Sequence, residues 1–400
     1  MSVEITLIVL SSLVIFSYLF DLIAKRFRIP SVILLLLSGM GLRYLSTLME
    51  LPFLNFEAFL PLIGTVGLIL IVLEGSLELR LDRGKSGLIK KSLGSAMFVL
   101  LLTTVAIAAY FYLSTAQPLR VCFLNAIPLG VISSAIAIPS ASNLPNNRRE
   151  FIVYESSFSD IFGIILFNFI LTNQIISAQS FLLLGWDTFL ILVLSGLFCL
   201  LLLYLLKRIT HHLKFFLILA VLILVYAIGK HYHLPTLVIV LAFGLFLNNL
   251  HWIQAHWFLK NFTYDNFQKD LNQLTQLSGE SAFLVRTFFF LIFGYSLDLA
   301  SLATMDVLIS GSIILFFIFI IRIGFLKLAV STSSWAEFFL APRGLITLLL
   351  FFSIPDNQLI PGLTNGLLFF IILGTSLIMT FGLLATRNQN PPSTNIGHLP

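Results

Sequence analysis

Long apolar runs alternate with short polar segments from the start of the chain to about residue 386. Most of these runs hold the roughly 17–25 residues that an α-helix needs to cross a bilayer, and thirteen can be laid down in succession, the ninth being short. The pattern predicts an all-α polytopic membrane protein with about 13 transmembrane helices. The predicted spans are Val3–Ala24, Pro30–Ser46, Phe59–Leu79, Leu88–Leu113, Leu119–Pro139, Phe151–Thr172, Leu182–Leu206, Phe215–Gly229, Thr236–Leu247, Ala282–Leu297, Val307–Val330, Phe338–Ile354 and Leu363–Leu384.

The composition agrees with this class of protein. Hydrophobic residues make up 58% of the chain and charged residues 10%, against roughly 25% charged residues in soluble domains. The net charge of +5 is therefore attributed to basic loops beside membrane lipid, and no nucleic-acid partner is predicted.

The basic residues orient the predicted spans. Sixteen of the 23 Lys and Arg residues lie in or beside loops that follow odd-numbered spans, and three lie in loops on the other side. Because cytoplasmic loops carry an excess of basic residues, we predict an N-terminus outside and a C-terminus in the cytoplasm. We expect an integral protein of a bacterial cytoplasmic (inner) membrane. The polar stretch His251–Ser278 is predicted to be a cytoplasmic helix lying along the membrane surface.

The chain also contains a weak internal repeat. Three stretches recur in order, each seven spans later: Pro30 to Gly39 matches Pro235 to Gly244, Ser76–Leu79 matches Ser296–Leu299, and Pro128–Ile132 matches Pro342–Ile346. Since seven is odd, the two copies must have opposite orientations in the membrane. Inverted repeats are typical of secondary transporters. We predict a first six-span repeat over 1–172, a connecting span over 173–210, a second six-span repeat over 211–386 and a short disordered cytoplasmic tail over 387–400.

Two of the predicted helices carry a Pro-x-Gly element at equivalent places in the two copies, at Pro128-Leu129-Gly130 and at Pro342-Arg343-Gly344. Transporters with inverted repeats bind their substrates between interrupted helices near the membrane midplane. We therefore predict that both helices are interrupted and that they cross near the midplane. The alternative is that proline and glycine only kink them, which transmembrane helices tolerate.

Asp160 is the most informative residue, because it lies in the apolar span Phe151–Thr172. Acidic residues in a membrane-spanning helix usually mark an ion or proton path. Ser156 lies four residues earlier and shares a helix face with Asp160, and Ser133 and Ser134 lie at the first predicted interruption. Hydroxyl and carboxylate oxygens are ligands for small hard cations, so these four residues are the predicted cation and proton site. The alternative is an aspartate that bonds a neighbouring helix.

Glu155 lies in the same span and needs a basic partner or a proton. The candidates are Arg322, Lys327 and Arg343, of which Arg343 lies at the second predicted interruption. Glu74 is a third acidic residue in a span; it either lines a cavity or ends the helix.

Enzymatic signatures are missing from the loops. The chain has no His-Glu-x-x-His, paired-Asp or nucleophile motif, so we predict that it is not an enzyme and needs no cofactor. The pairs His231-x-His233 and His251-x4-His256 lack a cysteine or acid to complete a tetrahedral set, so no resident metal is expected.

With these residues the chain resembles the monovalent cation–proton antiporter superfamily, the sodium/hydrogen exchanger-like transporters. Glu155-Ser156-x-x-Ser159-Asp160 resembles the Glu-Ser-x-x-Asn-Asp helix of that family, and Pro342-Arg343-Gly344 resembles its Arg-Gly element. Ser133 to Ile138 is similar to the first broken helix of the family. Weaker similarities lie at Leu73–Leu79 and Phe289–Gly294.

The resemblance implies exchange of Na+ or K+ for H+ by alternating access, in a homodimer whose core domain moves past a dimerisation domain. It implies Asp160 as the exchanging carboxylate, Glu155 paired with Arg343, and Arg322 as a core basic residue. The chain departs from the family at Ser159, where relatives carry Asn or Asp, and at Ser134-Ala135, where many carry Thr-Asp.

These departures lead to two further expectations. A single carboxylate at the site predicts one cation exchanged for one proton, which moves no net charge. The missing carboxylate at position 135 also keeps open a second class of function, a non-transporting or channel-like sensor built on the antiporter fold.

Overall fold

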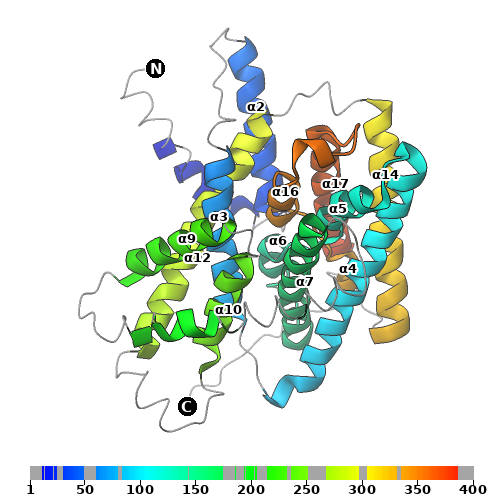
Figure 1. Cartoon of the computed structure of the whole chain (residues 1–400). Coiled ribbons are helices and arrows are strands. Elements are labelled where there is room, and N and C mark those ends of the chain that lie inside the picture. Colours follow the sequence, from blue (N-terminus) through cyan, green and yellow to red (C-terminus); the bar gives the residue numbers. More distant parts are fainter. Residues whose placement is uncertain are drawn as a thin grey trace, which may run out of the picture.

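The computed structural model describes most of the chain as helices (Figure 1). The residues it describes are 30–48, 60–79, 83–142, 144–173, 214–231, 236–250, 267–296, 304–330 and 335–385, with parts of 11–24 and 185–204. The main helices are α2 (Ser31–Leu48), α3 (Leu60–Glu78), α4 (Ser86–Thr115), α5 (Leu119–Gly130), α6 (Ser134–Ser140), α7 (Asn146–Thr172), α9 (Lys214–His231), α10 (Thr236–Asn248), α12 (Phe267–Ser296), α14 (Met305–Phe325), α15 (Trp335–Phe339), α16 (Leu345–Phe351) and α17 (Asn365–Ala385).

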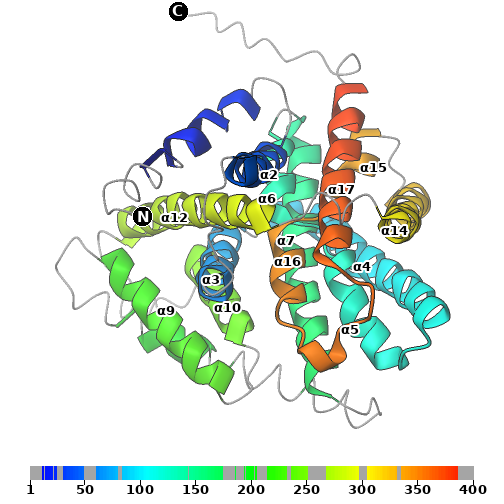
Figure 2. The same ribbon diagram turned by 90° about the horizontal axis from the view of Figure 1, so that it is seen from above.

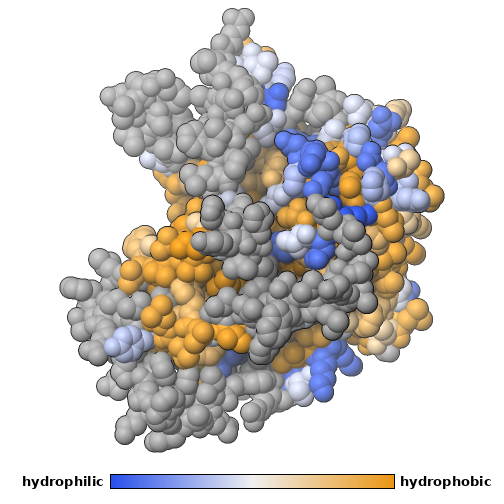
Figure 3. Space-filling view, viewed as in Figure 1, coloured by the Kyte–Doolittle hydropathy of each residue, from blue (hydrophilic) through white to orange (hydrophobic). Residues whose placement is uncertain are grey.

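The predicted class is confirmed. Within the described ranges, seven helices are long and apolar enough to cross a membrane. Large apolar side chains are exposed on the outer faces of the helices, among them Leu113 of α4 and Phe216 of α9, and Figure 3 shows wide apolar areas on one face of the molecule. Exposed apolar surface of this extent indicates contact with lipid. The count of thirteen and the inverted repeat stay predictions, since much of two predicted spans, Val3–Ala24 and Leu182–Leu206, lies outside the described residues.

Both predicted interruptions are present. α5 ends at Gly130 and α6 begins at Ser134, with an extended backbone between them. α15 ends at Phe339 and α16 begins at Leu345. The two interruptions touch, because the amide of Ser133 donates a hydrogen bond of 2.9 Å to the carbonyl of Pro342.

One predicted boundary is wrong. The stretch His251–Ser278 is not a separate surface helix in its described part, because α12 already begins at Phe267. Leu271, Leu274, Ser278 and Ala282 are all buried. These positions recur with the period of a helix face, so the polar segment continues the same buried stripe as the apolar span.

The helices pack as two bundles, seen from above in Figure 2. α2, α3, α9, α10 and α12 form the first, and α4, α5, α6, α7, α14, α15, α16 and α17 form the second. The first bundle contains very close crossings. An added Cβ on Gly39 of α2 would collide with the carbonyl oxygen of Leu291 in α12, and one on Gly244 of α10 would collide with the side chain of Ser76 in α3. Small residues let helix backbones approach this closely inside membranes.

Candidate functional site

Asp160 projects from the middle of α7 and is buried, with 6% of the residue exposed. Its Oδ2 atom accepts a hydrogen bond of 3.3 Å from the backbone amide of Ser134, at the start of α6. Its Oδ1 atom has no hydrogen-bond partner within the described ranges. One carboxylate oxygen therefore holds the broken helix in place, and the other is unused.

The first interruption is held through three successive amides. The amide of Ile132 donates to Ser159 Oγ at 2.9 Å, that of Ser133 to the carbonyl of Pro342 at 2.9 Å, and that of Ser134 to Asp160. A buried backbone amide without a partner is costly. Side chains of α7 and the second interruption therefore supply the bonds that the broken helix cannot make for itself.

A small cavity lies beside Asp160, between the two bundles. Its volume is about 20 Å³, which is space for about one water molecule. The second bundle contributes the only carboxylate in the lining and two hydroxyls, while α3 and α10 contribute mainly aliphatic side chains. The lining residues are Ile71, Val72, Gly75, Ser76, Leu79, Ser134, Ser157, Asp160, Ile161, Ile164, Leu241 and Ile346.

Of the four residues predicted to form the site, two line the cavity and two do not. Ser134 lines the cavity with Asp160. Ser156 does not line it, and its hydroxyl donates to the carbonyl of Ile152 in its own helix at 2.8 Å. Ser133 is buried outside the cavity lining, and its hydroxyl oxygen lies 2.7 Å from the position that a Cβ on Gly344 would take.

Ser157 lines the cavity and was not predicted. The available signal was its position three residues before Asp160, which also places two side chains on one helix face.

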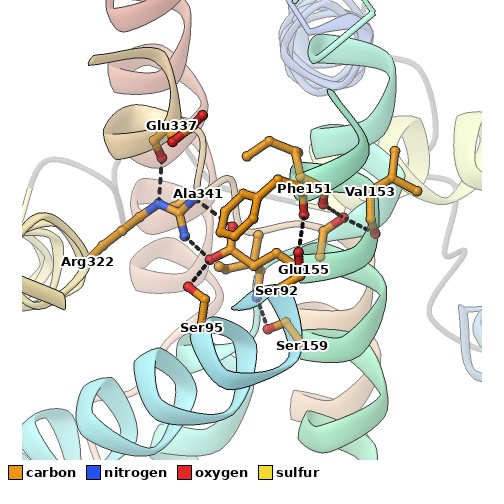
Figure 4. Close-up of polar contacts among 12 residues, drawn as sticks. Ser92, Ser95, Phe151, Val153, Glu155, Ser159, Arg322, Glu337 and Ala341 are labelled. Carbon is orange, nitrogen blue, oxygen red and sulfur yellow. Dashed lines mark hydrogen bonds and ion pairs between the residues drawn. The ribbon is translucent and has the colours of Figure 1, made fainter. Parts of the chain in front are cut away.

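Glu155 forms a buried ion pair with Arg322 of α14 (Figure 4). Arg322 Nη1 donates to Glu155 Oε1 at 3.0 Å and Nη2 to Oε2 at 2.9 Å. Ser95 of α4 donates to Glu155 Oε1 at 2.6 Å, and Arg322 Nε donates to the carbonyl of Glu337 in α15 at 3.0 Å. These hydrogen bonds form one buried cluster that connects four helices, α4, α7, α14 and α15.

The predicted pairing of Glu155 with Arg343 is wrong. Arg343 is also fully buried, but its Nε donates to the carbonyl of Leu129 at 2.7 Å and its Nη1 to the carbonyl of Ala341 at 3.0 Å. Leu129 lies in the last turn of α5, where helix carbonyls lack intrahelical partners and a cation is favourable. The interruptions leave carbonyls without helical partners, and Arg343 donates hydrogen bonds to one such carbonyl at each interruption.

Glu74 of α3 pairs with Arg286 of α12. Arg286 Nη2 lies 2.8 Å from Glu74 Oε2. Arg286 Nη1 also donates to the carbonyl of Ala135 in α6 at 3.1 Å. This guanidinium therefore links the first bundle to the broken helix of the second.

Comparison with known proteins agrees with this architecture. The model of one protein family, described as sodium/hydrogen exchanger, transmembrane, matches residues 10–386. The chain belongs to the sodium/hydrogen exchanger family. A search of curated protein sequences found no match.

Solved structures of similar fold extend the comparison to three dimensions. A structure of the sodium proton antiporter MjNhaP1 from Methanocaldococcus jannaschii at pH 8 is 20% identical, with a TM-score of 0.70, covering 95% of this chain and 100% of that one. An electron-microscopy map of the same antiporter gives 21% identity and a TM-score of 0.69, covering 97% of this chain and 96% of that one. The chain therefore shares that fold over almost its full length.

The geometry of this sodium/hydrogen exchanger defines what its site can do. Asp160 lines a cavity with space for about one water molecule, and one of its carboxylate oxygens has no hydrogen-bond partner among the described residues. A proton or a small hard cation can neutralise that oxygen, and both cannot do so fully at once. Glu155 has no comparable capacity, because both of its oxygens already accept hydrogen bonds from Arg322.

Proposed function

We propose that this sodium/hydrogen exchanger exchanges a monovalent cation, Na+ or K+, for H+ at Asp160. The observation that carries the proposal is the free Oδ1 atom of a buried aspartate that lines a cavity between two helix bundles. An uncompensated carboxylate in such a setting is costly. It therefore binds a proton or a cation in each state of the cycle, and the two compete for it.

We further propose that the site is exposed alternately to the two sides by movement of one bundle against the other. The bundles meet beside the cavity through aliphatic residues such as Val72, Ile164 and Leu241. Such contacts are non-directional, so they can be exchanged for similar ones at small cost. Cation exchange by this route needs no cofactor.

The inverted repeat is part of this proposal, and two close helix crossings support it. Gly39, in the second predicted span, packs against α12, the tenth. Gly244, in the ninth, packs against α3, the third. Spans two and nine are equivalent in the predicted repeat, and so are spans three and ten. Exchanging the two copies therefore turns one contact into the other, as an internal two-fold relation requires.

We propose the cytoplasmic membrane as the location, with the N-terminus outside, from the distribution of basic residues. A homodimer follows from the resemblance to the antiporter superfamily, and exposed apolar side chains such as Phe216 offer surface for lipid or for a second copy.

The decisive experiment is Asp160→Asn, which keeps the shape and the acceptor for Ser134 but removes the charge. Everted vesicles carrying a pH-sensitive dye, titrated with Na+, K+ and Li+, should show no cation-driven proton movement. Asp306→Asn makes the same change at an exposed residue of α14, and it should leave exchange unchanged. Exchange at the wild-type rate in Asp160→Asn would contradict the proposal.

A non-transporting sensor is the second candidate, and the absence of a carboxylate at Ala135 favours it. Counter-flow separates the two, because a transporter accumulates labelled Na+ transiently against a gradient of unlabelled Na+. No counter-flow by the intact protein, with cation binding retained, would favour the sensor.

A further inference from the structure

The polar side chains around the middle of α7 can be assigned one at a time. Glu155 is held by Arg322, Ser156 donates to the carbonyl of Ile152, and Ser159 accepts from the amide of Ile132. Among the described residues, Ser157 Oγ and Asp160 Oδ1 are left without a partner on this stretch of α7. Two oxygen atoms of this helix therefore form no hydrogen bond, although the neighbouring polar side chains do.

These two oxygen atoms belong to the same face of the helix. Residues three apart in an α-helix are separated by about 4.5 Å along the axis and are neighbours on its surface. Ser157 and Asp160 both line the small cavity between the bundles, and each is 6% exposed. Two residues that each carry an unpaired oxygen therefore line a space for about one water molecule or small ion.

The free hydroxyl of Ser157 is notable because a serine in a helix normally has an easy partner. It can donate to the carbonyl four residues earlier, as Ser156 does at 2.8 Å. Leaving a buried hydroxyl without a bond costs free energy. An unpaired hydroxyl on a residue that lines a cavity is available to an ion bound in that cavity.

Other buried hydroxyls without partners do not share this position. In the described part of the chain they belong to Thr103, Thr104, Ser133, Ser278, Thr347 and Ser376. None of these residues lines the cavity at Asp160. The unpaired hydroxyl of Ser157 is therefore singled out by its location.

We propose that Ser157 Oγ is a ligand of the transported cation and helps to set which alkali ion is bound. The proposal rests on the function proposed above for Asp160. With the cation bound, Asp160 Oδ1 and Ser157 Oγ both direct lone pairs at it. With Asp160 protonated, the cation has left and Ser157 Oγ is an acceptor for the new carboxyl O–H. Selectivity among hard cations depends on cavity size and ligand number, and this residue contributes to both.

Ser157→Ala tests the proposal, with Ser376→Ala as its matched control. In proteoliposomes, initial exchange rates are measured against the concentrations of Li+, Na+ and K+. Losing one polar contact to a charged group should raise the KM for the preferred cation roughly tenfold in Ser157→Ala. The kcat should change by less than about twofold, and the order or ratio of the three cations should change. Ser376 of α17 also has a buried hydroxyl without a partner among the described residues, but it does not line the cavity, so Ser376→Ala should alter KM by less than about twofold.

The outcomes separate this proposal from the one on which it rests. Unchanged KM and unchanged cation ratios in Ser157→Ala, with Asp160→Asn inactive, overturn the role of Ser157 and leave the exchange function standing. Activity in Asp160→Asn overturns the function itself. Ser157→Thr provides a second variant if the alanine protein does not fold, since it keeps the hydroxyl and narrows the cavity. A shift toward the smaller cation supports the proposal, and unaltered selectivity contradicts it.

Discussion

Arg322 and Glu155 meet through two parallel hydrogen bonds in a fully buried part of the second bundle. The arginine belongs to α14 and the glutamate to α7, so the pair joins two helices through residues that lie 167 positions apart in the sequence. A bidentate arginine–carboxylate pair fixes direction as well as distance. The pair therefore sets how the helix that carries Asp160 is oriented within its bundle.

Glu155→Gln should destabilise the protein strongly, because it leaves the Arg322 guanidinium buried without a counter-charge. Breaking one side of a buried pair costs roughly 3–5 kcal/mol. The apparent melting temperature in detergent measures the effect. The double variant Glu155→Leu/Arg322→Met removes both charges and should recover most of the loss, whereas a double variant no more stable than Glu155→Gln contradicts the pairing.

Arg343→Ala should also destabilise, for a different reason. It leaves the carbonyl of Leu129 without its donor and opens a large buried space, which together should cost more than about 2 kcal/mol. Arg149→Ala removes an exposed arginine and should be nearly neutral. If Arg343 were instead an ion-pair partner of Glu155, Glu155→Leu would rescue Arg343→Ala; we expect no rescue in a thermal melt.

The sequence was sufficient to predict the helices and their interruptions, and insufficient to predict which charges meet. Apolar runs and Pro-x-Gly elements act locally, so α5, α6, α15 and α16 end close to where the pattern placed them. The choice between Arg322 and Arg343 depends on which buried group each can reach, and that is decided by helix packing.

Gly39→Ala should weaken the crossing of α2 and α12. The added methyl group collides with the carbonyl of Leu291 and lies 2.8 Å from the amide nitrogen of Tyr295, and backbone cannot move aside as a side chain can. We expect a loss of roughly 1–3 kcal/mol. Gly41→Ala lies in the same helix with nothing within 4 Å of the new Cβ, and it should melt like the wild type. Equal melting temperatures for the two variants would contradict the close crossing.

Exchange should be independent of membrane potential. Asp160 is the only carboxylate among the residues that line the cavity, so the proposed exchange of one cation for one proton should move no net charge. Proteoliposomes with an imposed potassium diffusion potential provide the measurement. Ser159→Asp places a second carboxylate beside the first and should make exchange depend on potential. A strong dependence in the wild type contradicts the one-for-one stoichiometry.

The candidate site shows the same limit of sequence reasoning as the ion pairs. Asp160 was identifiable because an acid in an apolar span is rare. Ser156 and Ser157 are both on helix positions near Asp160, and nothing in the sequence tells which hydroxyl bonds its own helix. The pairing of Arg286 with Glu74 could not be predicted either, because the two residues lie 212 positions apart in the chain and only packing brings them together.

The amides of Ile132, Ser133 and Ser134 make no bonds to their own helix; each is tied to α7 or to the second interruption. Pulling the broken segment away from α7 would rupture all of these ties together. The segment and its aspartate are therefore held together as one unit, and in the proposed exchange a bound ion would change compartments together with its ligands.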